Sequence, residues 1–393
     1  MSFLRAARAA LAGQTGFPRM LVAAVAGLAS LFVSCGTNSH VNPNGPSHNA
    51  YVSLPGKGSV LQLHINNATG VITIGSKTPQ VQNTTPTGLA LLPSKKFLYA
   101  VNSFSDTISI FAVAGDGSLT LTGTPTPEGG SAPDLAVIDP SGKYLLVTNS
   151  LGDILNQDGS ISVFSIDAGS GALTPFGSPV AANADPTSII FTHNGKFVYV
   201  TNPVKGLVTG FTFSNGVLTQ VKNSPLISGA GASALAVDGG DKFLYVVNPA
   251  ATNPGLTTIG NVSGFNIDPN TGELTSILGS PFTASFGTGP SAITVDPTGK
   301  FVYAVTPGSS YSIWCFDIAP LTGELTAVTN SPFSLSSGGQ FALIDPSGSY
   351  FYIGNQAAGN LLGYTYNPAT GVLTAISGSP FVTGVPGAMV LSE

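Results

Sequence analysis

DPSGKYLLVTN, at residues 139–149, decides the fold, because the chain contains six versions of this turn and strand. The turns are LPSKK, DPSGK, THNGK, DGGDK, DPTGK and DPSGS, and the strands are FLYAVN, YLLVTN, FVYVTN, FLYVVN, FVYAVT and FYIGN. Gly or Asn in such turns supplies tight hairpin geometry. Strands in which β-branched and aromatic residues are nearly continuous are expected to be buried on both faces.

The repeat that contains this unit starts seven times, with spacings of 47, 53, 46, 58, 49 and 47 residues. A short apolar strand precedes each turn, and a third strand and a shorter fourth strand follow, with endings such as GSPF at residues 279–282. No helical periodicity is present. The pattern predicts an all-β, seven-bladed β-propeller with four-stranded antiparallel blades. The seven starts are Pro86, Pro133, Pro186, Ala232, Pro290, Gly339 and Pro386.

The two ends of the chain complement each other. Residues 386–393 supply only a first strand, whereas residues 49–81 supply a second, a third and a fourth. We therefore expect one blade to be closed by the N- and C-terminal strands together. Such closure removes the exposed sheet edges that invite aggregation.

Composition supports this fold class. Of 393 residues, 42% are hydrophobic and 8% are charged, with 49 Gly and 29 Pro. The length is ample for several large cores. The hydrophobic content disfavours an ordinary disordered chain, and the few charges disfavour a coiled coil and a basic nucleic-acid binder.

The N-terminal residues carry an export signal. Arg5, Arg8 and Arg19 precede an uncharged apolar stretch at residues 20–33, and small residues follow it. This predicts a signal peptide over residues 1–34. The stretch is shorter than the about 20 residues of a membrane-spanning helix, so removal is favoured over a signal anchor, which stays open.

Residues 31–35, LFVSC, resemble a bacterial lipobox, with Phe32 where leucine is usual. The resemblance implies that Cys35 is lipidated, and an ordinary cleaved signal is the alternative. Residues 35–48 are then a lipoprotein-type flexible tether, and residues 49–393 are the propeller. We expect an exported protein of the bacterial cell envelope, held to the membrane through Cys35.

The mature chain is acidic. All three arginines precede Cys35, which leaves 10 Lys, no Arg and 18 acidic residues, a net charge of −8. Because Arg is the usual bidentate anchor for phosphate, we expect no nucleic-acid partner. The other cysteine, Cys315, lies in a strand-like run and is expected to be a buried, unreactive thiol.

Tyr199, Val200, Thr201 and Asn202 spell the motif of the YVTN propeller repeats. The wider pattern of DPSGK, YVxN, FxIDxxTGxLT and GSPF resembles the lactonase family of seven-bladed propellers, which includes bacterial 6-phosphogluconolactonases. The resemblance covers about residues 48–393. It implies a propeller fold and leaves the activity open, since propellers serve many functions.

One face of the predicted ring is expected to bind the ligand. Loops between second and third strands emerge there together with the blade-to-blade connections, and the insertions at residues 150–160 and 249–261 mark it. Its acidic residues are candidates for a cation site or a hydroxyl-rich ligand, although solvated surface is the favoured role. These acids are Asp106, Asp134, Asp153, Asp158 and Asp185. Asn102, Asn149, Asn202, Asn248 and Asn355 end second strands near the same face, where turn capping is favoured over ligand contact.

Catalytic residues are scarce. Lactone hydrolysis needs a base and oxyanion donors, and a phosphorylated substrate also needs cations. Lactonase relatives tend to carry GPRH at the first strand and Glu after the second-strand Asn, whereas this chain has APDL, DPTS and GPSA at residues 132–135, 185–188 and 289–292. His48 is placed beside the tether and His193 on the opposite face, so neither is expected to be catalytic.

We therefore expect a binding or scaffold module for a small ligand, a glycan or an envelope protein. The alternative is a lactone hydrolase for a neutral sugar lactone, with Asp134, Asp185 or Asp153 as the base. A structural module of the cell surface is a third possibility. Neither a cofactor nor a bound metal is expected, and the protein is expected to be a monomer.

Overall fold

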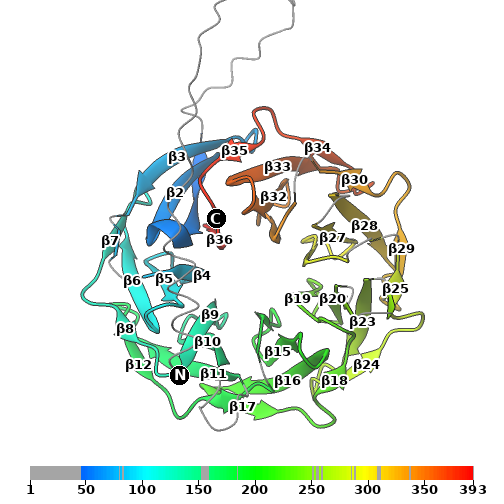
Figure 1. Ribbon diagram of the computed structural model, residues 1–393, viewed down its shortest axis with the longest axis horizontal. Coiled ribbons are helices and arrows are strands. Elements are labelled where there is room, and N and C mark those ends of the chain that lie inside the picture. The colour runs from blue at the N-terminus through cyan, green and yellow to red at the C-terminus, as the bar shows by residue number, and fades with distance from the viewer. Residues whose placement is uncertain are drawn as a thin grey trace, which may run out of the picture. The chain divides into compact units, whose positions relative to one another are not determined.

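Each predicted repeat forms one antiparallel sheet, and the sheets follow one another around a ring (Figure 1). The computed structural model describes residues 46–392, except 79, 82–83, 152–158, 184, 250–251, 254–255, 258–259, 285, 287–288, 308–310 and 336–337. Within these residues there are seven blades, and the predicted seven-bladed propeller is confirmed. The predicted signal segment, Cys35, Asp153 and Asp158 lie outside the described residues.

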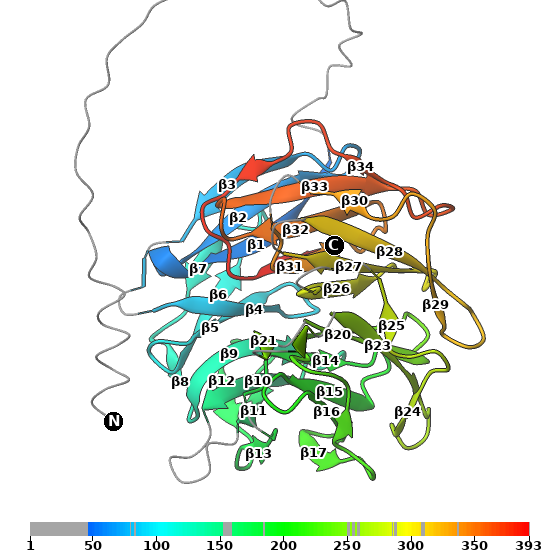
Figure 2. The same ribbon diagram turned by 45° about the vertical axis from the view of Figure 1, so that its right-hand side comes forward.

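The closing blade, blade 1, joins the two ends of the chain as predicted. Its strands are β36 (Met389–Leu391), β1 (Ser47–Leu54), β2 (Ser59–Asn66) and β3 (Ile72–Lys77), in that order from the ring axis outward. The C-terminal β36 pairs with β1, with Tyr51 opposite Val390. Figure 2 shows blue β1–β3 beside the red end of the chain. A 3-10 turn, η1 (Pro55–Lys57), connects β1 to β2.

Blades 2, 3 and 4 repeat this plan from the innermost strand outward. Blade 2 contains β4 (Pro86–Leu91), β5 (Phe97–Asn102), β6 (Thr107–Val113), β7 (Leu119–Leu121) and β8 (Thr126–Pro127). Blade 3 contains β9 (Ser131–Ile138), β10 (Tyr144–Leu151), β11 (Ser160–Ile166), β12 (Leu173–Pro175) and β13 (Val180–Ala181). Blade 4 contains β14 (Ser188–Phe191), β15 (Phe197–Asn202), β16 (Leu207–Ser214), β17 (Val217–Gln220) and β18 (Leu226–Ile227).

Blades 5, 6 and 7 complete the ring. Blade 5 contains β19 (Ala234–Val237), β20 (Phe243–Asn248), β23 (Asn261–Ile267), β24 (Leu274–Ser276) and β25 (Phe282–Thr283), with the hairpin β21 (Thr252–Asn253) and β22 (Leu256–Thr257) between β20 and β23. Blade 6 contains β26 (Ala292–Val295), β27 (Phe301–Thr306), β28 (Ser312–Ile318), β29 (Leu325–Ala327) and β30 (Phe333–Ser334). Blade 7 contains β31 (Phe341–Ile344), β32 (Tyr350–Asn355), β33 (Asn360–Tyr366), β34 (Leu373–Ala375) and β35 (Phe381–Val382).

The outermost strand of blades 2–7 differs in one respect from the prediction of a single fourth strand. It consists of two short pieces, such as β24 and β25, which both pair with the third strand of their blade. The Gly and Pro of the GSPF endings lie between the pieces. Proline cannot donate a ladder hydrogen bond, so the strand is interrupted there.

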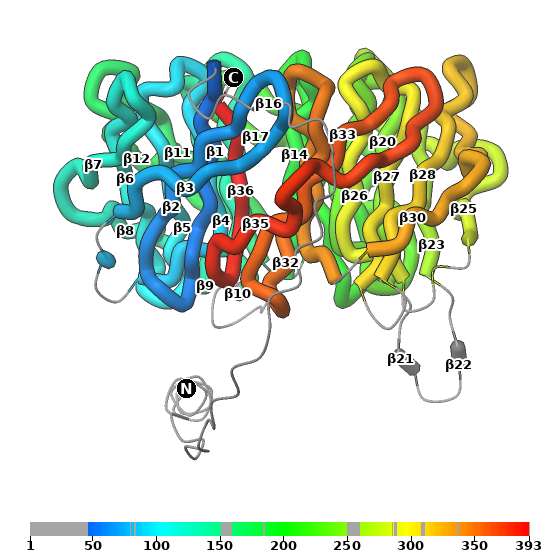
Figure 3. Tube along the Cα trace, turned by 90° about the horizontal axis from the view of Figure 1, so that it is seen from above, coloured from blue at the N-terminus to red at the C-terminus, as the bar shows by residue number. Residues whose placement is uncertain are grey.

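The strands run between two faces of the ring (Figure 3). We call the face with the first-to-second and third-to-fourth strand turns, such as residues 139–143 and 167–171, the turn face. The face with the second-to-third strand loops and the blade-to-blade connections, such as residues 103–106 and 128–130, is the loop face. The pairing of Pro86 with Asn102 at the start of blade 2 places the connection and the loop at the same end.

The cores lie between neighbouring blades. One cluster, for example, combines Tyr199 of β15 with Leu244 and Val246 of β20. Second strands are buried throughout in blades 2, 4, 5, 6 and 7, as their continuous apolar sequences predicted.

A tyrosine on the second strand joins most blades to the next one. Its buried hydroxyl donates a hydrogen bond of 2.8–3.0 Å to a glycine carbonyl in the third-to-fourth strand turn of the following blade. We call this contact the tyrosine latch. The six latches are Tyr51 to Gly117, Tyr99 to Gly171, Tyr199 to Gly272, Tyr245 to Gly323, Tyr303 to Gly371 and Tyr352 to Gly70.

The latch requires glycine for two reasons, which Gly272 illustrates. Its φ of +73° lies in the left-handed region, which disfavours residues with a side chain. A Cβ added there would also lie 2.4 Å from the Phe197 ring of the preceding blade. The recurrent TG of the sequence thus reflects both the turn and the close approach of two blades.

The junction between blades 3 and 4 has no latch. Leu146 occupies the tyrosine position of β10, and the facing turn of blade 4 is a two-residue hairpin at Asn215 and Gly216. An aromatic contact joins the two blades instead. The ring of Tyr144 in β10 packs edge-on against the ring of Phe213 in β16, with 5.7 Å between the ring centroids.

Candidate functional site

Asp134 lies on the loop face at an irregularity of the innermost strand β9. The register of β9 against β10 shifts between Val147 and Asn149, so Asp134 and Leu135 lie opposite Thr148 alone. The Thr148 hydroxyl accepts a hydrogen bond from the Leu135 amide at 3.1 Å. Bulges of this kind often redirect a side chain beside a functional site.

The neighbouring innermost strand β4 is irregular at the same level, between Pro86 and Gly88. The two strands touch there, since the Thr87 hydroxyl donates to the Asp134 carbonyl at 3.0 Å. A Cβ on Gly88 would lie 2.4 Å from that carbonyl oxygen. Glycine at this position therefore allows the backbones of blades 2 and 3 to meet beside Asp134.

Asp185 belongs to the connection between blades 3 and 4 and has a φ of +29°. Burial raises the pKa of the Asp134 carboxyl, the Asp185 charge raises it further, and a hydrogen bond from Thr87 opposes both effects. Two of the predicted acids thus lie on the loop face of blade 3, one in its innermost strand and one in the connection that follows it.

Asp106 also lies on the loop face, but its contacts are structural. Its Oδ1 accepts a hydrogen bond from the Ala132 amide at 2.9 Å, and its backbone carbonyl accepts one from the Glu128 amide at 2.9 Å. Both bonds fix the connection between blades 2 and 3. That connection leads directly into β9 and Asp134.

Glu128 is a site residue that the sequence prediction missed. Its side chain is buried, and Oε2 accepts a hydrogen bond from the Gly130 amide at 2.6 Å. Burial raises the pKa of Glu128, with hydrogen bonds from Ser162, Gly130 and Asn149 opposing the shift. The sequence offered one signal, because Glu128 is the charged residue of the short connection at residues 128–130.

Asn149 connects Glu128 to blade 3. The Asn149 amide has partners for both its nitrogen and its oxygen in one orientation. In that orientation Nδ2 donates to Glu128 Oε2 at 2.8 Å, and Oδ1 accepts from the hydroxyls of Ser162 at 2.9 Å and Ser160 at 3.1 Å. The Asn149 side chain is fully buried. Its described contacts are with the protein itself.

The other predicted asparagines are also buried and contact their own blades. Asn102 and Asn248 donate to the Ser109 and Ser263 hydroxyls, each at 2.9 Å. Asn202 Oδ1 accepts from the Lys205 amide at 3.0 Å. Asn355 accepts from the Ala358 amide at 3.1 Å. These hydrogen bonds link neighbouring strands or cap turns.

Two lysines, Lys57 and Lys205, lie in second-to-third strand loops of the loop face. The histidines and the cysteine of the described residues lie elsewhere. His193 is on the turn face, where its Nδ1 hydrogen bonds to Asp241 at 2.8 Å. Cys315 is buried and free, and burial raises the pKa of its thiol to about 12, as expected of an unreactive cysteine. His48 requires a correction, because it lies within β1 rather than beside a tether, and β1 begins at Ser47, two residues before the predicted start of the propeller.

Among the described residues, no three His, Cys, Asp or Glu side chains gather closely enough to hold a metal ion. The same residues also contain no helix of the length and apolar character needed to cross a membrane.

The fold and site define a closed seven-bladed propeller with two carboxylates on the loop face, Asp134 in the innermost strand of blade 3 and Asp185 in the connection that follows this blade. The family model "Lactonase, 7-bladed beta-propeller" matches residues 48–187, 180–281 and 259–391. The chain therefore belongs to this lactonase family, as the resemblance implied.

Three relatives illustrate the similarity. A 6-phosphogluconolactonase of Serratia proteamaculans is 26% identical over 257 residues, which cover 63% of this chain and 71% of that protein. A candidate 6-phosphogluconolactonase of Bacteroides uniformis has a TM-score of 0.73 at 20% identity, covering 88% of this chain and 99% of that one. The periplasmic gluconolactonase PpgL of Pseudomonas aeruginosa has a TM-score of 0.72 at 17% identity, with the same coverages.

Proposed function

We propose that this protein is an envelope propeller that binds a neutral, hydroxyl-rich ligand of the sugar class on its loop face. The observation that carries the proposal is the placement of two carboxylates on the loop face, with Asp134 at the bulge of β9 and Asp185 in the connection that follows blade 3. Carboxylate oxygens accept hydrogen bonds from hydroxyl groups. The same charges repel a phosphorylated ligand.

The absence of arginine after Arg19 supports this choice of ligand class. Phosphate recognition usually relies on Arg or clustered Lys. Lys143, Lys196 and Lys300 lie in first-to-second strand turns of the turn face, and the loop-face lysines Lys57 and Lys205 belong to different blades, blades 1 and 4. A 6-phosphogluconolactonase activity is therefore the less favoured reading of the family membership.

The proposal includes export and a lipid anchor. It rests on the arginines, the apolar stretch and the lipobox-like residues 31–35 ahead of the propeller. Mass spectrometry of the mature N-terminus tests it. A diacylglyceryl group on Cys35 would support the anchor, and an unmodified or uncleaved N-terminus would contradict it.

Ligand binding is tested by titrating the purified protein with neutral sugars, gluconolactone and 6-phosphogluconate while monitoring heat and melting temperature. We expect a neutral ligand to bind and Asp134→Asn and Asp185→Asn to weaken it at least about tenfold, the effect of losing a charge-assisted hydrogen bond. Asp268→Asn, an exposed turn-face variant, is the control and should bind normally. Equal binding by all variants would contradict the proposed site.

Hydrolysis of a neutral sugar lactone is the second candidate. The raised pKa of Asp134 favours it, because a general base works best when its pKa lies nearer the working pH. The Serratia relative is named a 6-phosphogluconolactonase and the structurally similar Pseudomonas protein a gluconolactonase, which supports this candidate. Acid release from gluconolactone, abolished by Asp134→Asn but retained in Asp268→Asn, would establish hydrolysis over simple binding.

If no lactone or sugar binds, the role of a scaffold for an envelope protein is favoured instead. A pull-down from envelope extract then compares the native loop face with an Asp106→Ala variant. Asp106 orders the connection that leads into β9, so its loss should disturb a partner that docks there. Capture that is unaffected would place the partner elsewhere.

A further inference from the structure

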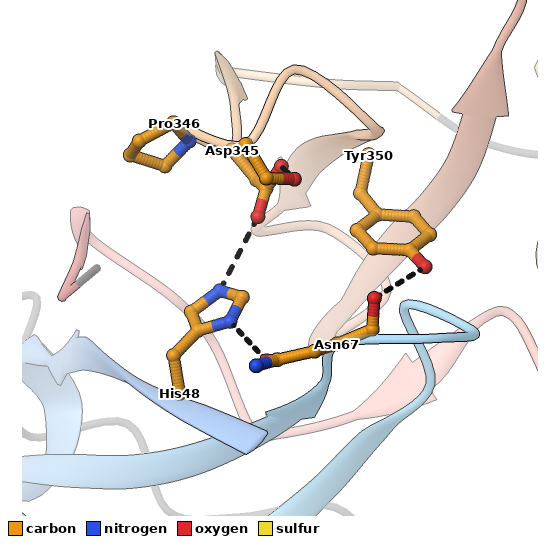
Figure 4. Close-up of a pocket in the computed structure, with 6 residues that line it drawn as sticks. His48, Asn67, Asp345, Pro346 and Tyr350 are labelled. Carbon is orange, nitrogen blue, oxygen red and sulfur yellow. Dashed lines mark hydrogen bonds and ion pairs between the residues drawn. The ribbon is translucent and has the colours of Figure 1, made fainter. Parts of the chain in front are cut away.

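A small cavity lies on the turn face where blade 7 meets the closing blade. It measures about 260 Å³ and is lined by residues of β1, the β2–β3 turn and the β31–β32 turn (Figure 4). His48 of β1 faces Asp345 of the β31–β32 turn across it. The cavity is remote from the loop face and plays no part in the proposed sugar site.

His48 presents an unused nitrogen to this cavity. Its side chain is 14% exposed, and its Nδ1 lies 2.8 Å from the acceptor oxygen of Asn67. In the tautomer with the proton on Nδ1, this nitrogen donates to Asn67 Oδ1, and Nε2 offers a lone pair. Nε2 is buried and has no hydrogen-bond partner among the described residues.

Asp345 differs from the equivalent turn residues of other blades. In Asp139 and Asp296 both carboxylate oxygens accept hydrogen bonds from the turn that follows. In Asp345 the bonds from the Ser347 hydroxyl and the Ser349 amide both go to Oδ1. The other carboxylate oxygen, Oδ2, therefore faces His48. The Asp345 side chain is only 1% exposed.

Nε2 of His48 and Oδ2 of Asp345 are 3.4 Å apart and share no hydrogen bond. When Nε2 carries no proton, the two atoms face each other as acceptors, and either a proton on Nε2 or a metal ion between the two atoms relieves this unfavourable arrangement. Ligand bonds of about 2.0–2.1 Å in a tetrahedral zinc site place neighbouring donor atoms at about 3.4 Å. The separation of this pair therefore matches that of two ligands of one metal ion.

We propose that His48 and Asp345 bind a divalent transition-metal ion of the zinc type and thereby join blade 7 to the closing blade. The Asn67 side chain holds the imidazole in the ligating tautomer, and Ser347 and Ser349 orient the carboxylate. The cavity leaves room for water as the remaining ligands. With two protein ligands, the site is a reversible one.

The chain offers a matched control in its other histidine–aspartate pair. His193 Nδ1 and Asp241 Oδ1 are 2.8 Å apart and hydrogen bonded, so a proton already occupies the space between them. Asp241 also accepts hydrogen bonds from the His193 and Asn194 amides. This pair is not expected to bind metal.

The test uses the untagged mature protein after EDTA treatment and dialysis. Zinc is titrated calorimetrically, and the melting temperature is measured with and without zinc, with magnesium as the hard-cation comparison. We expect one zinc per chain and a higher melting temperature with zinc only. His48→Gln and Asp345→Asn should abolish both effects, Asn67→Ala should weaken binding about tenfold, and His193→Gln should change neither.

Circular dichroism of each variant establishes that it is folded before titration. Asp345→Asn is the safer variant, because its remaining side-chain oxygen can still accept the bonds from Ser347 and Ser349. Failure of the native protein to bind zinc would overturn the proposal. Binding that survives both His48→Gln and Asp345→Asn, or that is lost equally in His193→Gln, would also overturn it.

Discussion

The junction between blades 3 and 4 differs from the other six in how its two blades are held. At six junctions a buried tyrosine hydroxyl donates to a glycine carbonyl of the next blade. At this junction Leu146 has no hydroxyl to donate, and the facing turn of blade 4 has only two residues. Tyr144 and Phe213 supply an aromatic contact in place of the hydrogen bond. The ring thus closes with two different kinds of joint.

The loop face shows where the two carboxylates lie relative to these joints. Asp185 lies in the connection between blades 3 and 4, whereas Asp134 lies at the latched junction of blades 2 and 3, where its carbonyl accepts a hydrogen bond from Thr87. Apolar packing is non-directional and tolerates small shifts better than a hydrogen bond of fixed length. The comparison teaches that one junction can replace a directional hydrogen bond by apolar packing while the ring still closes.

Removing residues 386–393 should have the largest effect on the ring. The deletion removes β36, the buried Met389 and the hydrogen bonds that Ser53 makes with residues 387 and 388, so we expect a loss of about 5 kcal/mol or more of unfolding free energy. Urea unfolding measures it. A melting temperature equal to that of the intact chain would contradict closure by the two termini.

Gly272→Ala should break a latched junction. The left-handed φ costs about 1 kcal/mol, and the clash with Phe197 adds about 1–3 kcal/mol. Gly177→Ala is the matched control, because Gly177 has a φ of +74° and no atom within 4 Å of an added Cβ. Equal losses of unfolding free energy in the two variants would show that close approach of the blades is unimportant.

Phe213→Ala should weaken the unlatched junction by about 2–3 kcal/mol, less than for a fully buried phenylalanine because its ring is partly exposed. Ile227→Ala on the same blade is the control, since Ile227 is 81% exposed and its loss should cost less than about 0.5 kcal/mol. Chemical denaturation of both variants distinguishes them. A small loss for Phe213→Ala would mean that the aromatic contact does not replace the latch.

Tyr245→Phe should give the smallest effect and the sharpest comparison. It removes a hydroxyl that donates at 2.8 Å and leaves the buried Gly323 carbonyl without it, at a cost of about 1–2 kcal/mol. Tyr144→Phe keeps its ring contacts and should cost less than about 0.5 kcal/mol. If Tyr144→Phe proves the more damaging variant, the distinction between the two kinds of joint is wrong.

The candidate site was predictable only in part. The loop positions of Asp134 and Asp185 followed from the repeat. The bulge of β9 at Asp134 and the left-handed backbone of Asp185 did not. Glu128 was missed because it lies in a connection outside the repeated pattern. His48 was misplaced because its sequence neighbours resemble a tether, whereas its contacts come from Asn67 and Asp345.

The sequence by itself determined the number of blades, their strand order and the closure by the two termini. These follow from local patterns of turn residues and buried strands, repeated at nearly constant spacing. The tyrosine latches, the exceptional junction and the contacts of His48 were decided only by the tertiary structure. Each depends on two segments of different blades, and a local pattern does not specify the distance between side chains so far apart in the chain.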